Sequence, residues 1–268
     1  MNRYQQLFTQ LEAKNEGAFI PFVVLGDPDY EQSKEILRTL IDSGADALEV
    51  SILFTDPVAD GPAIQDAVLR AFAADMSVAR SFDLLKEIRD EYPDIPIGLL
   101  MYANLVHAAG IDAFYARAKE AGVDSVLVAD VPVREYHTFH KAAVKHKIDP
   151  ILICPPDASD ETIEAIAHYG SGYTYLVSRA GVTGMETQAE VPLKENIARL
   201  EQANAAPIVQ GFGIGTPEQV AHFIASGVKG VISGSAIAEL IKEHLTDRDE
   251  MLRKLAQFTA AMKAATQR

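Results

Sequence analysis

Two carboxylates close together in the sequence are the first candidates for chemistry. Glu49 lies in the apolar run Ala47-Leu48-Glu49-Val50, which has the character of a buried strand. A carboxylate that points inward from such a strand is desolvated, which raises its pKa and suits it to proton transfer. The alternative is that Glu49 points outward and pairs with a basic residue on a helix, because perturbed acids are often structural.

The second carboxylate, Asp60, follows 11 residues later in the segment Asp56-Pro57-Val58-Ala59-Asp60-Gly61-Pro62. Acids, glycine and prolines together predict a shaped loop that brings a carboxylate back over the strand end. The same residues also form ordinary polar turns, so this segment leaves function and turn both open.

Glycines cluster in two segments near the C-terminus, Gly211-Phe212-Gly213-Ile214-Gly215 and Ser233-Gly234-Ser235. Glycine lets the backbone approach an anion closely, and exposed N–H groups at a helix N-terminus supply donors. Both segments follow late strands, where barrel enzymes often bind phosphate. We therefore predict a phosphate site there, with simple tight turns as the alternative.

Other chemistry finds little support in the sequence. The seven histidines show no metal-ligand spacing, and no Walker A, G-x-S-x-G or dinucleotide motif is present. We therefore expect neither a metal nor a cofactor. Cys154 reads as a buried apolar residue rather than a nucleophile. Tyr173 and Tyr175 lie on one strand face, where one could line an interior or both could simply pack.

Eight short apolar runs that alternate with amphipathic helical stretches would position these groups. Their continuous apolar character is typical of parallel strands covered by helices. The predicted strands are Phe19–Leu25, Ala47–Val50, Ile97–Met101, Ser125–Ala129, Ile151–Cys154, Thr174–Val177, Ile208–Gly211 and Gly230–Ile232.

Eight strand–helix units without a linker predict an α/β fold with one domain over residues 1–268, a (β/α)8 TIM barrel. A doubly wound open sheet is the alternative. An extra helix at Tyr4–Lys14 should cap one end of the barrel. Long segments follow the second and sixth strands, at Ser51–Pro62 and Ser178–Pro192, and such loops are often lids.

The composition limits the classes of partner that the protein can bind and the compartment in which we expect it. The net charge of −14 would repel nucleic acid and anionic membranes, so we expect neither as a partner. The single cysteine does not imply an oxidising compartment, and the N-terminus lacks the apolar stretch of a signal peptide. No run is long enough to span a bilayer. We expect a cytoplasmic protein.

Several segments together resemble the tryptophan synthase α subunit family over essentially the whole chain. The matching stretches are Pro21-Phe22-Val23-Val24-Leu25-Gly26-Asp27-Pro28, Gly44-Ala45-Asp46-Ala47-Leu48-Glu49, Asp56-Pro57-Val58-Ala59-Asp60-Gly61-Pro62, Met101-Tyr102-Ala103-Asn104, Val128-Ala129-Asp130-Val131-Pro132, Gly181-Val182-Thr183-Gly184 and Gly211-Phe212-Gly213-Ile214.

The resemblance implies a lyase of tryptophan biosynthesis that splits indole-3-glycerol phosphate into indole and glyceraldehyde 3-phosphate without a cofactor. Glu49 would move protons between the indole C3 and the glycerol hydroxyl. Asp60 would accept the indole N–H and stabilise the positively charged indolenine. Thr183 and Arg179 would belong to a lid loop, with Thr183 also at the substrate.

The resemblance also assigns three groups of residues. The apolar indole pocket would comprise Phe22, Leu100, Leu127, Ile153, Tyr175, Phe212 and Ile232, and the phosphate site Gly184, Gly213, Gly234 and Ser235. A pyridoxal-phosphate β subunit would complete an α2β2 complex. It would contact an exposed patch of Asp56, Tyr102, Asn104, His107 and Pro132.

The sequence departs from the family pattern in one loop. Relatives carry Gly-x-Pro where Ser51-Ile52-Leu53 stands here, and His107 replaces an aromatic or apolar residue. A lost glycine predicts strain if its φ is positive, and Leu53 would add an exposed or partner-facing apolar side chain. Loop closure and coupling to the partner are therefore in question.

Two other functions remain as alternatives. One is another phosphate-sugar barrel, such as an epimerase or an indole-forming synthase, but the clustered metal ligands and the lysine near a strand's C-terminal end that these need are missing. The only strand-proximal lysine, Lys229, lies at a strand's start. The other is a partner-binding regulatory subunit that binds ligand with impaired turnover because of Ser51 and Leu53.

Overall fold

The computed structural model describes residues 1–177 and 193–268, and within them the strands form one closed parallel barrel. Neighbouring strands follow the order β5-β4-β3-β2-β1-β9-β8-β7-β6. The strands are β1 (Ala18–Val24), β2 (Leu48–Ser51), β3 (Ile97–Met101), β4 (Ser125–Val128), β5 (Asp149–Pro150), β6 (Leu152–Cys154), β7 (Thr174–Val177), β8 (Ile208–Gly211) and β9 (Gly230–Ser233).

The two ends of that order meet because β5 and β6 are halves of one barrel strand. Only Ile151 separates them, and its N–H donates to the Val126 carbonyl at 3.1 Å. β5 pairs with β4 and β6 pairs with β7, all in parallel. The eight-stranded barrel predicted from the sequence is thus confirmed, and the open sheet is wrong.

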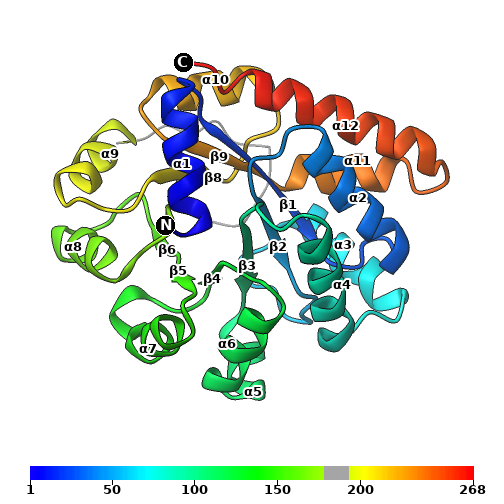
Figure 1. Cartoon of the computed structure of the whole chain (residues 1–268), viewed down its shortest axis with the longest axis horizontal. Coiled ribbons are helices and arrows are strands. Elements are labelled where there is room, and N and C mark those ends of the chain that lie inside the picture. The colour runs from blue at the N-terminus through cyan, green and yellow to red at the C-terminus, as the bar shows by residue number, and fades with distance from the viewer. Residues whose placement is uncertain (178–192) are drawn as a thin grey trace.

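Helices cover the outside of the barrel (Figure 1). In chain order they are α2 (Tyr30–Asp42), α3 (Pro62–Ala73), α4 (Val78–Glu91), α5 (Ala103–Ala109), α6 (Ile111–Glu120), the 3-10 turn η1 (Val133–Glu135), α7 (His137–His146), α8 (Asp160–Tyr169), α9 (Leu193–Gln202), α10 (Pro217–Ala225), α11 (Ser235–Glu243) and α12 (Arg248–Ala264). No helix in the described part of the chain is long and apolar enough to cross a membrane.

Local sequence explains where these elements begin. α10 starts with a capping box, in which the Thr216 side chain accepts from the Gln219 N–H and the Gln219 side chain accepts from the Thr216 N–H. Ser159 caps α8 in the same position. Each predicted strand agrees with an observed one to within one residue at each end, apart from the divided fifth strand.

The helix α1 (Arg3–Ala13) lies across the end of the barrel where the strands begin (Figure 1). Its Tyr4 is buried, and the Tyr4 hydroxyl lies 2.9 Å from Ser125 Oγ at the start of β4. Arg3 and Arg89 both bind the Asp124 carboxylate at 2.7 Å. Because this end is filled by side chains and ion pairs, any substrate must enter from the other end, where the strands finish.

Candidate active site

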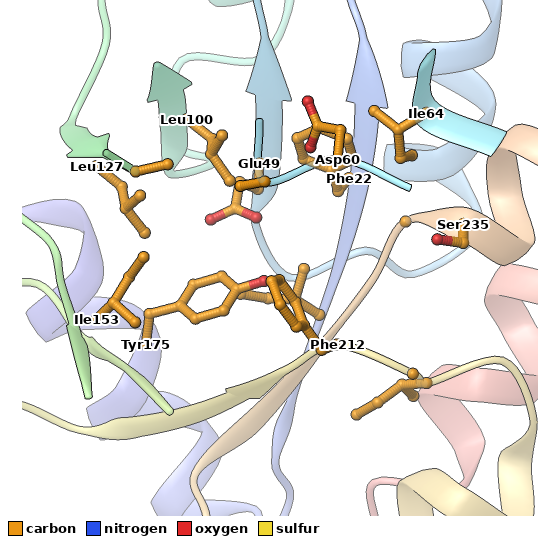
Figure 2. Close-up of a pocket in the computed structure, with 16 residues that line it drawn as sticks. Phe22, Glu49, Asp60, Ile64, Leu100, Leu127, Ile153, Tyr175, Phe212 and Ser235 are labelled. Carbon is orange, nitrogen blue, oxygen red and sulfur yellow. The ribbon is translucent and has the colours of Figure 1, made fainter. Parts of the chain in front are cut away.

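A cavity opens at the C-terminal ends of the barrel strands (Figure 2). Its empty space, mouth included, is about 660 Å³, within the range of small-molecule sites. The residues around it are Phe22, Glu49, Ala59, Asp60, Ile64, Leu100, Leu127, Ala129, Ile153, Tyr175, Phe212, Gly213, Ile214, Ile232, Gly234 and Ser235.

Strand alternation places most of this lining. Residues at every second position of a barrel strand point inward, so each strand, or the residue just past it, contributes one large group. The indole-pocket residues expected from the sequence all line the cavity: Phe22, Leu100, Leu127, Ile153, Tyr175, Phe212 and Ile232. One apolar chamber therefore gathers residues that are far apart in the chain.

Glu49 points into this chamber from β2, and its carboxylate is almost fully buried, with an exposed fraction of 1%. The Tyr173 hydroxyl donates to Glu49 Oε1 at 2.6 Å. Glu49 Oε2 has no hydrogen-bond partner among the described residues. Burial raises the pKa of Glu49 to about 7, although the Tyr173 hydrogen bond opposes the shift. The outward, ion-paired arrangement is thus wrong.

Asp60 reaches the same chamber from the loop that joins β2 to α3. The Tyr102 hydroxyl donates to Asp60 Oδ2 at 2.9 Å, and Gln65 Nε2 donates to the Asp60 backbone carbonyl at 2.7 Å. The side chain is buried, so desolvation raises its pKa to about 6 against the Tyr102 hydrogen bond. Two buried carboxylates with raised pKa values thus face one cavity, as is common where acid–base catalysis takes place.

Two aromatic rings form the wall opposite the carboxylates (Figure 2). Tyr175 and Phe212 meet edge to face, with ring centroids 6.1 Å apart. A Cβ at Gly211 would come within 2.1 Å of the Tyr175 ring, so glycine is required there. Phe212 has a φ of +69°, a costly backbone state for a bulky residue that is typical of functional sites.

The glycines expected at a phosphate site lie at one end of the cavity. Gly213, Gly234 and Ser235 line it, and in Figure 2 Ser235 is well separated from Leu127 and Ile153 at the other end. Ser235 opens α11, whose N-cap Gly234 has no side-chain cap. First-turn N–H groups have no partner within a helix and attract anions. Gly184, Thr183 and Arg179 fall outside the described residues.

Four of the five expected partner-contact residues are exposed: Asp56, Asn104, His107 and Pro132. The expected exposure of Tyr102 is wrong, because the residue is only 3% exposed and its hydroxyl donates to Asp60. Its ring stacks on Phe54 with centroids 5.2 Å apart. Stacking and hydrogen bonding turn Tyr102 toward Asp60 and Phe54 and bury it, so it is not part of an exposed patch.

The loop with Ser51 and Leu53, which departs from the family pattern, also differs from expectation. Ser51 is the last residue of β2 and is not among the residues with positive φ, so it carries no left-handed strain. The predicted exposure of Leu53 is wrong, because its side chain is only 4% exposed and packs in the core. Both substitutions are accommodated within the barrel.

Sequence patterns missed part of the lining. Ala59, Ile64 and Ile214 line the cavity but lie outside the strands, where period-two alternation gives no signal. Ala129, just past β4, follows the lining residue Leu127 by two positions but is not part of the predicted pocket. Ile64 lies in the first turn of α3, the helix that follows the loop carrying Asp60. Within the described ranges, no group of three or more His, Cys, Asp or Glu side chains is arranged to hold a metal ion.

The chain is similar to known proteins over nearly its whole length. The sequence pattern of the tryptophan synthase alpha chain matches residues 8–267. A tryptophan synthase alpha chain of Pectobacterium atrosepticum is 60% identical over 266 residues, which covers 99% of each chain. One from Escherichia coli O81 is 58% identical over the same length and coverage.

Solved structures agree with this similarity. Tryptophan synthase subunit alpha from Legionella pneumophila superimposes with a TM-score of 0.89 at 29% identity, covering 99% of this chain and 98% of that one. A chain of Mycobacterium tuberculosis tryptophan synthase gives a TM-score of 0.89 at 26% identity, covering 100% and 99%.

Proposed function

This chain belongs to the tryptophan synthase alpha chain family, and on that premise we propose that its cavity splits indole-3-glycerol phosphate with Glu49 and Asp60 as the catalytic residues. The chain is a carbon–carbon lyase of tryptophan biosynthesis. The observation that carries the residue assignment is the unpartnered, buried Oε2 of Glu49, which faces an apolar chamber.

Glu49 carries out the proton transfers in this proposal. With a pKa of about 7 it is partly protonated near neutral pH, so Oε2 can give its proton to the indole C3. The carboxylate that remains then accepts the proton of the hydroxyl on the glycerol carbon that is bonded to C3. The bond between that carbon and C3 breaks, its electron pair returns to the indole ring, and glyceraldehyde 3-phosphate leaves. Glu49 ends protonated, as it began.

Asp60 stabilises the charge that forms between these two transfers. Protonation at C3 makes the indole nitrogen part of a cationic iminium, whose N–H is a strong donor. An ionised Asp60 with a pKa of about 6 accepts that hydrogen bond in a largely apolar chamber. Such preorganised electrostatic stabilisation is often the largest contribution to catalysis. The cationic ring is the electron sink, so no cofactor enters the reaction.

The cavity's two ends fit the two ends of the substrate. The apolar end with Leu127 and Ile153 suits an indole ring, and the end with Gly213 and Ser235 suits a phosphate. Gly184 and Thr183 would complete the phosphate and substrate contacts from the segment outside the described residues.

The phosphate assignment is tested by adding a side chain at Gly213, which has a φ of +74°. Gly213→Leu should raise KM for the substrate at least about tenfold while changing kcat less, since it removes binding rather than chemistry. Gly227→Leu is the matched control, because Gly227 also has a positive φ but is exposed and away from the cavity. Equal KM values for the two variants would contradict the site.

The partner is a tryptophan synthase β subunit, with which the chain forms a complex. We propose α2β2 stoichiometry, and contact through Asp56, Asn104, His107 and Pro132, which are exposed on loops and helices that follow β2, β3 and β4. Cytoplasmic residence and a single domain over residues 1–268 are part of the same proposal.

A steady-state assay of indole release, with and without β subunit, tests the function. We expect slow turnover by the isolated chain and a severalfold or larger increase with β subunit, because lids without a partner spend more time open. Ligand binding without turnover, even in the complex, would instead support a regulatory subunit. The ordinary backbone at Ser51 and the buried Leu53 give that alternative no structural cause.

A further inference from the structure

Tyr102 makes two hydrogen bonds with the loop that carries Asp60. Its hydroxyl donates to Asp60 Oδ2 at 2.9 Å and accepts from the Ala59 N–H at 3.2 Å. A phenol has one proton, and the Ala59 N–H can only donate. The phenolic proton is therefore free to go to Asp60, and an ionised Asp60 carboxylate can only accept it.

The Tyr102 ring itself is held from two sides. It stacks on Phe54 from the same loop, and the residue is the N-cap of α5 at the end of β3. The next residue is anchored as well, because the Ala103 N–H donates to Asp130 Oδ1 at 2.8 Å. The phenol is thus tied to two neighbouring strand ends and has little freedom to move away from Asp60.

We propose that Tyr102 is a positioning residue for Asp60, an inference that rests on the proposed function. By occupying Oδ2, the phenol leaves Oδ1 as the oxygen that receives the indole N–H. It also favours the ionised carboxylate, because a donor to an acid stabilises the charged form. Burial alone would push Asp60 toward the neutral acid, which cannot stabilise a cation.

The test compares Tyr102→Phe with the wild type in complex with β subunit. Phenylalanine keeps the ring and its stacking on Phe54 but lacks the hydroxyl. We expect kcat to fall about 10- to 100-fold, as for a lost hydrogen bond to a charged group, with a smaller change in KM. The ratio of wild-type to variant kcat/KM should be largest at low pH and decline as pH rises, since Asp60 in the variant ionises at higher pH.

A second readout does not depend on turnover. The pKa of Asp60 can be followed by carboxyl ¹³C NMR in the ligand-free chain, with Asp60→Asn identifying its signal. Loss of the phenol should move this pKa upward, because the Tyr102 hydrogen bond lowers it. A merely structural role would leave the titration of Asp60 unchanged.

Tyr92→Phe is the matched control, because the Tyr92 hydroxyl also donates to an aspartate, Asp42, at 3.0 Å but on the surface. We expect its activity and the pKa of Asp60 to match the wild type. An unchanged pKa of Asp60 in Tyr102→Phe would overturn the inference. Failure of the wild type to release indole would overturn the proposed function instead, while the titration would still decide the role of Tyr102.

Discussion

Glu49→Gln should lower kcat for indole release at least about 100-fold while the barrel stays folded, because glutamine keeps the shape of Glu49 but cannot exchange a proton. The Tyr173 hydroxyl can still donate to the amide oxygen, so the side chain should hold its place. KM should change little, since the indole and phosphate ends of the cavity are untouched.

The same variant should be more stable than the wild type in alkaline solution. The pKa of Glu49 is raised to about 7 from an ordinary 4.5, so the folded state favours the neutral acid. Stability from that preference is complete below about pH 4 and is lost as pH rises through about 7. At pH 8 the ionised, buried carboxylate costs up to about 3 kcal/mol, which the amide avoids.

Thermal unfolding of the two proteins across pH measures this effect beside the kinetics. Glu87→Gln is the control, because Glu87 is a surface carboxylate paired with Lys34 at 2.9 Å. It should keep full activity and gain no stability at high pH. Wild-type rates of indole release by Glu49→Gln would contradict the assignment of Glu49.

The barrel could be predicted because its signal is local and repeated. Strands such as β1 are buried along their whole length, so they appear in the sequence as unbroken apolar runs. The division of the fifth strand was not predicted. Pro150 has no N–H to donate, the N–H of Ile151 beside it still donates to the Val126 carbonyl of β4, and pairing with β7 begins only at Leu152.

The residues of the site also divide into those that the sequence predicts and those that it does not. Glu49 and most of the predicted lining lie on strands, where alternation fixes direction, and Phe212 lies just past β8. The family resemblance supplied the roles of these residues. Tyr102 and Leu53 follow strand ends, where no period applies and tertiary contacts decide the direction. The resemblance placed Tyr102 in an exposed patch, whereas stacking on Phe54 and the bond to Asp60 bury it.

Asp60→Asn should also lower kcat/KM at least about 100-fold near neutral pH, because asparagine can accept the indole N–H but brings no negative charge to the cationic ring. The amide oxygen can still accept from Tyr102, so the loop between β2 and α3 should keep its path. The loss would then report electrostatics and not a displaced loop. Near-UV circular dichroism checks that the fold is retained.

The pH dependence assigns this effect to ionisation of Asp60. Wild-type activity should rise through about pH 6 as Asp60 ionises and fall through about pH 7 as Glu49 loses its proton. A substrate phosphate also titrates near pH 6, but it contributes equally to both proteins. The ratio of wild-type to Asp60→Asn kcat/KM cancels both the phosphate and Glu49. That ratio should rise with pH through about 6 and then level off. A ratio independent of pH would mean that the negative charge of Asp60 does not stabilise the transition state.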